Sequence, residues 1–208
     1  MASTVTWAPC VLFLLLAGHA GVLAVRDRTS PTAVVGHLLH LLMAVDMVLM
    51  ALEMGNLATT WSPIPAWMHG AVFAAGTSWY LALLAVWCAG VPRRRQAARH
   101  TGWSTVGHLV HHTVMMLAMV WMAAAMAAGD HHHGGGHISG PEMSMLSTPM
   151  ALLGVACTVT LVAGATLLTV EVVERRREQP RLTGILRRAA SPVMSYAMAV
   201  MCWAMTTL

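Results

Sequence analysis

Residues 106–126 read VGHLVHHTVMMLAMVWMAAAM, and this stretch decides the class of fold. It contains three histidines and five methionines, and the chain has no Asp, Glu, Lys or Arg between Arg99 and Asp130. As a helix, an uncharged apolar run of this length crosses the roughly 30 Å hydrocarbon core of a membrane. The stretch therefore predicts a transmembrane helix that carries metal-binding side chains.

Four of these methionines are spaced by 4, 3 and 4 residues, which places them on one face of a helix. We call such a row a methionine ladder, and this one consists of Met115, Met119, Met122 and Met126. The three histidines continue that face toward the start of the helix; they are His108, His111 and His112. One side of the predicted helix thus presents thioethers, with imidazoles at one end.

The composition of the whole chain agrees with a membrane protein. Hydrophobic residues make up 57% of the 208 residues and charged residues only 10%. Six apolar segments are predicted to span the membrane, at approximately 4–25, 33–54, 65–90, 104–128, 149–172 and 190–208. The first is expected to be a retained helix, because it lacks the basic start of a signal peptide. We predict an all-α helical bundle that forms one transmembrane domain over residues 1–208.

The arginines predict the topology. All twelve basic residues are arginines, and they fall in three alternate connections, at 26–28, 93–99 and 175–188. By the positive-inside rule these connections face the cytoplasm, so both termini face outward from the plasma membrane. The last of them lies in a basic cytoplasmic connection over residues 173–189. No basic run is interleaved with aromatic residues, so the charge does not indicate a nucleic-acid partner.

The second predicted span repeats the pattern of the fourth. Shifted by 71 positions, residues 35–38 (VGHL) match residues 106–109, and His40 matches His111. A second methionine ladder with the same 4, 3 and 4 spacing follows, formed by Met43, Met47, Met50 and Met54. These matches predict an internal duplication of the two spans.

A third ladder lies in the last predicted span and consists of Met194, Met198, Met201 and Met205. Twelve of the eighteen methionines belong to the three ladders. Methionine on a helix face commonly serves only to pack the core, and a helix–helix seam has the same spacing. Metal binding is the alternative, since leucine would pack equally well. The three spans run in one direction, so we predict that their ladders face a common interior.

The histidines at the inner ends of spans two and four predict a binding site. Pairs three or four residues apart on one helix can converge on one ion. The predicted ligands are His37, His40, His108, His111 and His112. Asp46 lies beside the second ladder, where an intramembrane carboxylate either holds a neighbouring helix or lies on an ion path.

The predicted outer loop at 129–148 is rich in glycine, histidine and methionine, and is expected to be flexible. Imidazoles bind copper, zinc or nickel, while thioethers select copper(I), so the combination favours copper. Its candidate ligands, near Asp130, are His131, His132, His133, His137, Met143 and Met145.

The His-x-x-His start followed by a methionine ladder, at 37–54 and 108–126, resembles a family of multi-pass membrane proteins of actinobacteria. That family is known only as a domain of unknown function, so the resemblance implies a membrane fold and no activity. A weaker likeness is to copper-resistance inner-membrane proteins, whose histidines and methionines handle periplasmic copper. This chain lacks a motif specific to them.

Three functions remain open from the sequence. The first is copper binding, transport or buffering, with lipid, the copper ion and a homo-oligomer or periplasmic copper chaperone as partners. The second is a b-type haem protein, in which His37 or His40 of span two and His108 or His111 of span four supply the axial ligands. The third is a structural subunit or permease whose methionines merely pack. No arrangement of a nucleophile, glycine loop or paired carboxylates indicates an enzyme.

Overall fold

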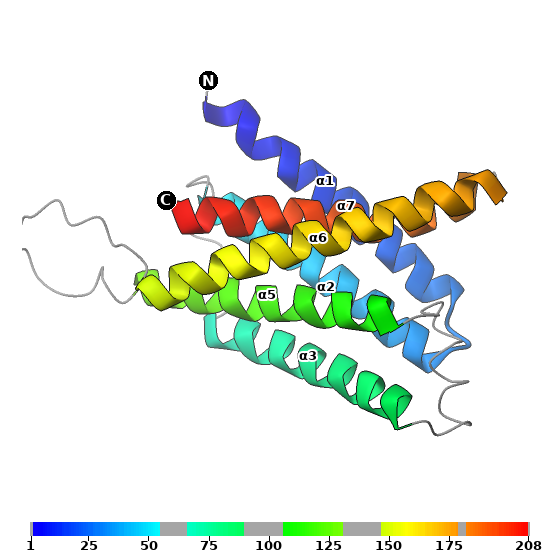
Figure 1. Ribbon diagram of the computed structural model, residues 1–208. Coiled ribbons are helices and arrows are strands. Elements are labelled where there is room, and N and C mark those ends of the chain that lie inside the picture. The colour runs from blue at the N-terminus through cyan, green and yellow to red at the C-terminus, as the bar shows by residue number, and fades with distance from the viewer. Residues whose placement is uncertain (1, 55–65, 90–105, 131–146, 179–181, 208) are drawn as a thin grey trace, which may run out of the picture. The chain divides into compact units, whose positions relative to one another are not determined.

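The computed structural model describes residues 2–54, 66–89, 106–130, 147–178 and 182–207. Within these ranges the chain forms six helices and no strand, which confirms the all-α prediction (Figure 1). The helices are α1 (Ala2–Arg26), α2 (Pro31–Met54), α3 (Ala66–Cys88), α5 (Val106–Asp130), α6 (Thr148–Glu178) and α7 (Leu182–Thr207).

Five of the helices are long and apolar enough to cross a membrane, so the chain is a membrane protein. Their spanning parts are Trp7–Arg26, Pro31–Leu52, Trp67–Cys88, Val106–Ala127 and Thr148–Glu174. The described part of α7 is not apolar enough to be counted as a membrane span. Ser191, Pro192 and Ser195 lower its mean hydropathy. The sixth span therefore stays a prediction.

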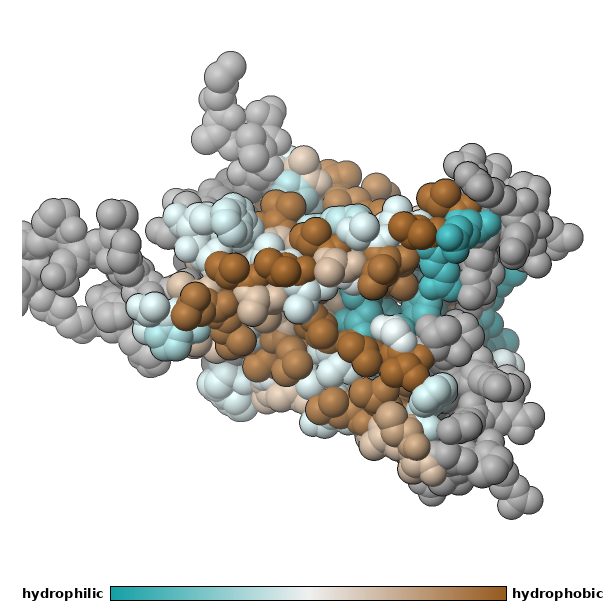
Figure 2. Space-filling view, in the orientation of Figure 1, coloured by the Kyte–Doolittle hydropathy of each residue, from teal (hydrophilic) through white to brown (hydrophobic). Residues whose placement is uncertain are grey.

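The surface of these helices suits lipid. On α1, Leu15 and Val22 are exposed, and on α6 Leu152 and Leu167 are. Apolar side chains follow the visible surface of α6 in Figure 2. In water such a surface would be unfavourable, whereas in a bilayer it contacts acyl chains.

Three exposed tryptophans lie near helix ends. Trp7 and Trp67 are close to the starts of α1 and α3, and Trp203 is close to the end of α7. All three ends belong to the side that the arginines predict to be outside. Exposed tryptophan is typical of the membrane interface, so these residues fit a belt at that surface. Trp61, for which we predict the same role, lies outside the described residues.

The described helices form two compact units. Unit 1 comprises residues 1–63 and 76–113, and unit 2 comprises residues 64–75 and 114–208. Helices α3 and α5 each contribute one part to each unit.

In unit 1, α1 packs against α2 after a tight turn. The turn is closed by the amide of Ser30, which donates to the carbonyl oxygen of Asp27 at 3.0 Å. The carbonyl of Ser30 then accepts the first hydrogen bond of α2, from the amide of Val34. Ser30 is a favourable residue before a helix, and Pro31 is favourable in its first position because its missing N–H is not needed there.

In unit 2, α6 packs along α7, and a glycine allows a close approach. A β-carbon at Gly154 of α6 would collide with the side chains of Trp121 and Thr206, which belong to α5 and α7. Trp121 also donates from Nε1 to the carbonyl oxygen of Met150, at 3.0 Å. These contacts hold α5, α6 and α7 together within unit 2, and a small residue such as Gly154 commonly permits such close packing in membranes.

The predicted connection at 173–189 is largely helical. Helix α6 continues to Glu178, and α7 begins at Leu182. The apolar run alone predicts an earlier end because hydropathy marks only the part of a helix that lies within lipid.

Candidate functional site

The candidate site begins on α5, the most enclosed of the five spanning helices. In the apolar stretch of α5 67% is buried, against 22–39% in the corresponding stretches of the other four helices. The buried side chains include His111 and His112, which are 6% and 4% exposed. Their neighbour Thr113 is equally buried, and its hydroxyl donates to the carbonyl oxygen of Leu109 at 2.9 Å. Imidazoles inside a membrane protein are costly to bury, and this makes them candidates for function.

Three helices of unit 1 meet at the ring of His112. The ring of His40, from α2, stands edge-on to it at a centroid distance of 4.7 Å and an angle of 87°. The ring of Tyr80, from α3, stacks on it at 5.6 Å and 24°. The ring of His111 lies 5.8 Å from it. We call these four residues the imidazole cluster.

A hydrogen bond decides which nitrogen of His40 can act as a ligand. Its Nδ1 atom lies 2.8 Å from the carbonyl oxygen of Gly36, one turn earlier on α2. A carbonyl only accepts, so Nδ1 carries the proton and the lone pair of the neutral ring is on Nε2. Metal-binding histidines are commonly oriented by such a bond from the other nitrogen.

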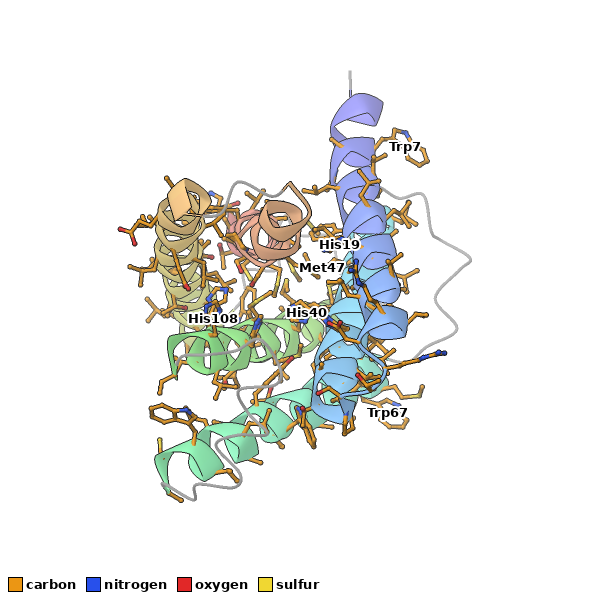
Figure 3. The ribbon with its side chains drawn as sticks, turned by 90° about the vertical axis from the view of Figure 1, so that its right-hand side faces the viewer. Trp7, His19, His40, Met47, Trp67 and His108 are labelled. Carbon is orange, nitrogen blue, oxygen red and sulfur yellow. The ribbon has the colours of Figure 1, made fainter. Side chains whose placement is uncertain are left out.

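His37 has a different partner. Its Nε2 atom lies 3.1 Å from Oδ2 of Asp27, in the turn that follows α1. We predict that His37 and His40 converge as a pair on one helix, but their hydrogen bonds lead to Asp27 and to Gly36. Figure 3 shows His40 on α2 and His108 near the start of α5.

The structure therefore joins histidines across helices, His40 with His112, rather than only within one helix. Among the described residues, no group of three or more His, Cys, Asp or Glu side chains is arranged to hold a metal ion. The predicted five-histidine ligand set thus stays a prediction.

The ladder methionines are deeply buried. The side chains of eleven of the twelve are described, all except Met54, and nine of these are at most 7% exposed. The nine are Met43, Met47, Met50, Met115, Met119, Met122, Met194, Met198 and Met201. Met126 and Met205, toward the ends of their helices, are partly exposed. Met116 belongs to no ladder and is also fully buried, because α5 is enclosed on more than one side.

Within unit 2 one contact links two of the ladders. The hydroxyl of Ser195 on α7 lies 3.5 Å from the sulfur of Met115 on α5. Ser195 is fully buried and directly follows Met194 of the third ladder. The ladder of α2 belongs to unit 1, so a common interior for all three ladders stays a prediction.

Sequence reasoning did not find two polar residues of this region, Tyr80 and Ser195. Each is a polar residue within an apolar helix, and that signal can be read from the sequence. Asp46, which the sequence singles out, is 5% exposed on α2. The candidate ligands of the outer loop, His131, His132, His133, His137, Met143 and Met145, lie outside the described residues, and so does the side chain of Asp130.

Comparison with known proteins places the chain in a family. Residues 32–205 match the family described as a domain of unknown function (DUF5134), so the chain belongs to this family. The predicted resemblance to such a family is confirmed.

Its relatives include uncharacterised proteins of Mycobacterium bovis and Mycobacterium tuberculosis, each 32% identical over 116 residues. The matched part is 56% of this chain and 47% of each relative. The chain thus spans about half the length of the curated relatives that it matches. No solved structure matches it.

Proposed function

We propose that this protein binds copper(I) inside the membrane and passes it along α5 between methionine thioethers and the imidazole cluster. The observation that carries the proposal is the order of buried ligands on one helix. His111 and His112 are followed by Met115, Met119 and Met122, and all five are at most 6% exposed. A membrane helix that serves only to span lipid has no need of imidazole and sulfur along its length.

The chemistry of these ligands suits copper(I). A thioether is soft and uncharged, so it favours copper(I) over zinc or magnesium. Each rung holds the ion weakly, and weak binding at several sites is what movement along a path requires. The imidazoles bind the ion more tightly than the thioethers do. They therefore hold it near Val106, at the N-terminal end of α5. Ions would reach the ladders from the outer loop, whose histidines and methionines remain predicted ligands.

A bis-histidine haem is the alternative use of the same histidines. Such a haem places its iron and porphyrin between two imidazoles. The rings of His40 and His112 are in direct contact at 4.7 Å, so a haem there would have to separate them. This contact argues against a haem between His40 and His112; a haem held by His37 or His40 with His108 or His111 remains the alternative.

Packing alone is the other alternative, because buried methionine fills a core well. Copper binding and packing predict different effects of replacing these methionines by leucine. Leucine preserves volume and burial but removes the sulfur, so it keeps the fold and abolishes a thioether ligand.

The test uses the full chain purified in detergent and treated with copper(I) under reducing conditions. We expect bound copper in the wild type and less in a variant with Met119→Leu and Met122→Leu. Met68→Leu is the matched control, because Met68 is 42% exposed on α3. An absorption spectrum of the same sample would show a Soret band if the ligand is haem. Equal copper in all three proteins would leave the methionines as packing residues.

A further inference from the structure

The contact between Asp27 and His37 forms a second feature, separate from the imidazole cluster. The two side chains meet at 3.1 Å and are 21% and 17% exposed, so both are only partly buried. His37 belongs to α2 and Asp27 to the turn before it. Arg26 and Arg28 lie on the same side of the protein. By contrast, His111 and His112 are only 6% and 4% exposed.

The turn between α1 and α2 fixes the position of the carboxylate. The amide of Asp27 donates to the carbonyl oxygen of Leu23 at 2.8 Å, and its own carbonyl accepts from Ser30 at 3.0 Å. Both backbone groups of Asp27 are therefore hydrogen-bonded within the turn. The backbone of Asp27 is thus held in place, and its side chain extends from there to His37 in the second turn of α2.

The carboxylate also fixes the tautomer of His37. An ionised carboxylate only accepts hydrogen bonds, so Nε2 of His37 carries a proton. The lone pair of the neutral ring then lies on Nδ1. A carboxylate that holds the non-ligating nitrogen of a histidine is a frequent arrangement behind metal sites, where it orients the ring and makes it more basic.

His37 lies between the surface and the cluster. It precedes His40 by three residues on α2, a spacing that puts both on neighbouring turns of one face. His40 contacts His112, so one helical turn separates the partly exposed imidazole from the buried cluster. The exposed side chains of Arg26 and Arg28 give this surface a positive charge, which attracts anions.

The geometry points to His37 as a transfer ligand, oriented by Asp27, through which copper(I) moves between the imidazole cluster and an anionic thiolate carrier in solution. This inference rests on the proposed function. The step is a ligand exchange in which the bond from Nδ1 of His37 to copper(I) breaks as a thiolate sulfur binds. Copper keeps its charge of +1, and no electron is transferred. Asp27 is a positioning residue, since it acts through His37.

The experiment measures how fast bound copper leaves the protein. The full chain, loaded with copper(I) in detergent without oxygen, is mixed with bathocuproine disulfonate, an anionic chelator whose copper(I) complex is coloured. A second series uses glutathione as the thiol. Asp27→Ala and His37→Asn are compared with His69→Asn, which changes a histidine at the start of α3. Copper content before mixing and helical circular dichroism show that each variant is folded and loaded.

We expect Asp27→Ala and His37→Asn to release the copper that they bind about tenfold more slowly than the wild type releases its copper, within the range of activity loss seen when the groups around a metal ligand are changed. His69→Asn should release it at the wild-type rate. Added salt should slow release from the wild type, and less so from Arg28→Gln. Unchanged rates of release of the bound copper in the two variants, or an equal effect of His69→Asn, would overturn the transfer role. A wild type that binds no copper at all would refute the proposed function instead.

Discussion

The hydroxyl oxygen of Ser195 lies 3.5 Å from the sulfur of Met115, and both side chains are fully buried in unit 2. The same hydroxyl lies 3.0 Å from the carbonyl oxygen of Ser191 on its own helix. Its single hydrogen can face either acceptor, so the donor stays satisfied if the sulfur turns toward another group. Met115 can therefore serve as a ligand without leaving a buried hydroxyl unpaired.

Substitution of Ser195 tests how tightly α5 and α7 pack. Ser195→Ala removes only a bond to a weak sulfur acceptor and one to a carbonyl of the same helix, so we expect a loss of less than about 1 kcal/mol. Ser195→Leu adds volume to a fully buried position and should cost about 1–3 kcal/mol of unfolding free energy. Unfolding in mixed detergent micelles measures both. Val200→Leu, at a position 67% exposed, is the control.

Gly154→Ala should destabilise the protein by about 1–3 kcal/mol, because its β-carbon collides with Trp121 and Thr206. Gly18 provides a matched control, since a β-carbon there meets nothing within 4 Å. Alanine at Gly18 should be neutral or stabilising by up to about 1 kcal/mol. The same unfolding measurement decides between them. Equal stability of the two variants would contradict the close packing around α6.

Trp121→Phe should cost more than the roughly 0.5–1.5 kcal/mol of the lost hydrogen bond to Met150, because the smaller phenyl ring also leaves a cavity at this buried position. Trp203→Phe removes an indole that is 53% exposed and should change the stability less. Thermal unfolding followed by circular dichroism compares the two. A larger effect at Trp203 would show that the interfacial ring, and not the tie between α5 and α6, stabilises this end.

Replacing His40 and His111 together by alanine should abolish bound copper, since two of the three imidazoles of the cluster are then lost. His69→Ala should leave the copper content unchanged. Copper is measured by elemental analysis of the purified variants, with circular dichroism to confirm the helices. Full occupancy in the double variant would remove the imidazole cluster from the proposed copper path.

Tyr80→Phe should keep the copper affinity, because the ring still stacks on His112. Tyr80→Leu loses the stacking, which is worth about 0.5–1.5 kcal/mol, and should weaken binding about two- to tenfold. Competition with a copper(I) chelator measures both affinities. If Tyr80→Phe weakens binding as much as leucine does, the hydroxyl and not the ring is the important group.

Most of the fold follows from the sequence because the signal is local. An apolar run long enough for a bilayer marks a helix, and a spacing of 4, 3 and 4 marks one face of it. The burial of Met43 and Met47 agrees with that face. Met116 shows the limit, because a helix enclosed on several sides buries residues that no single face predicts.

The histidine contacts were harder to predict. Helix periodicity pairs residues of one helix, such as His37 with His40, and says nothing of which helix crosses nearby. The contact of His40 with His112 depends on how α2 and α5 meet, and that of His37 with Asp27 depends on the turn geometry. Both arise from tertiary structure, which spacing in a single chain does not record.

The enclosure of α5 has a consequence for biosynthesis. Part of the covering of α5 comes from α6 and α7, which follow it in the chain and are synthesised later. The imidazole of His112 can already contact α2 and α3 at that stage, whereas Met115 and Trp121 lack their partners on α7 and α6 until those helices insert. Assembly of the protein therefore waits for its C-terminal third, and a nascent chain that stops after Asp130 leaves α5 without the contacts of Met150 and Ser195.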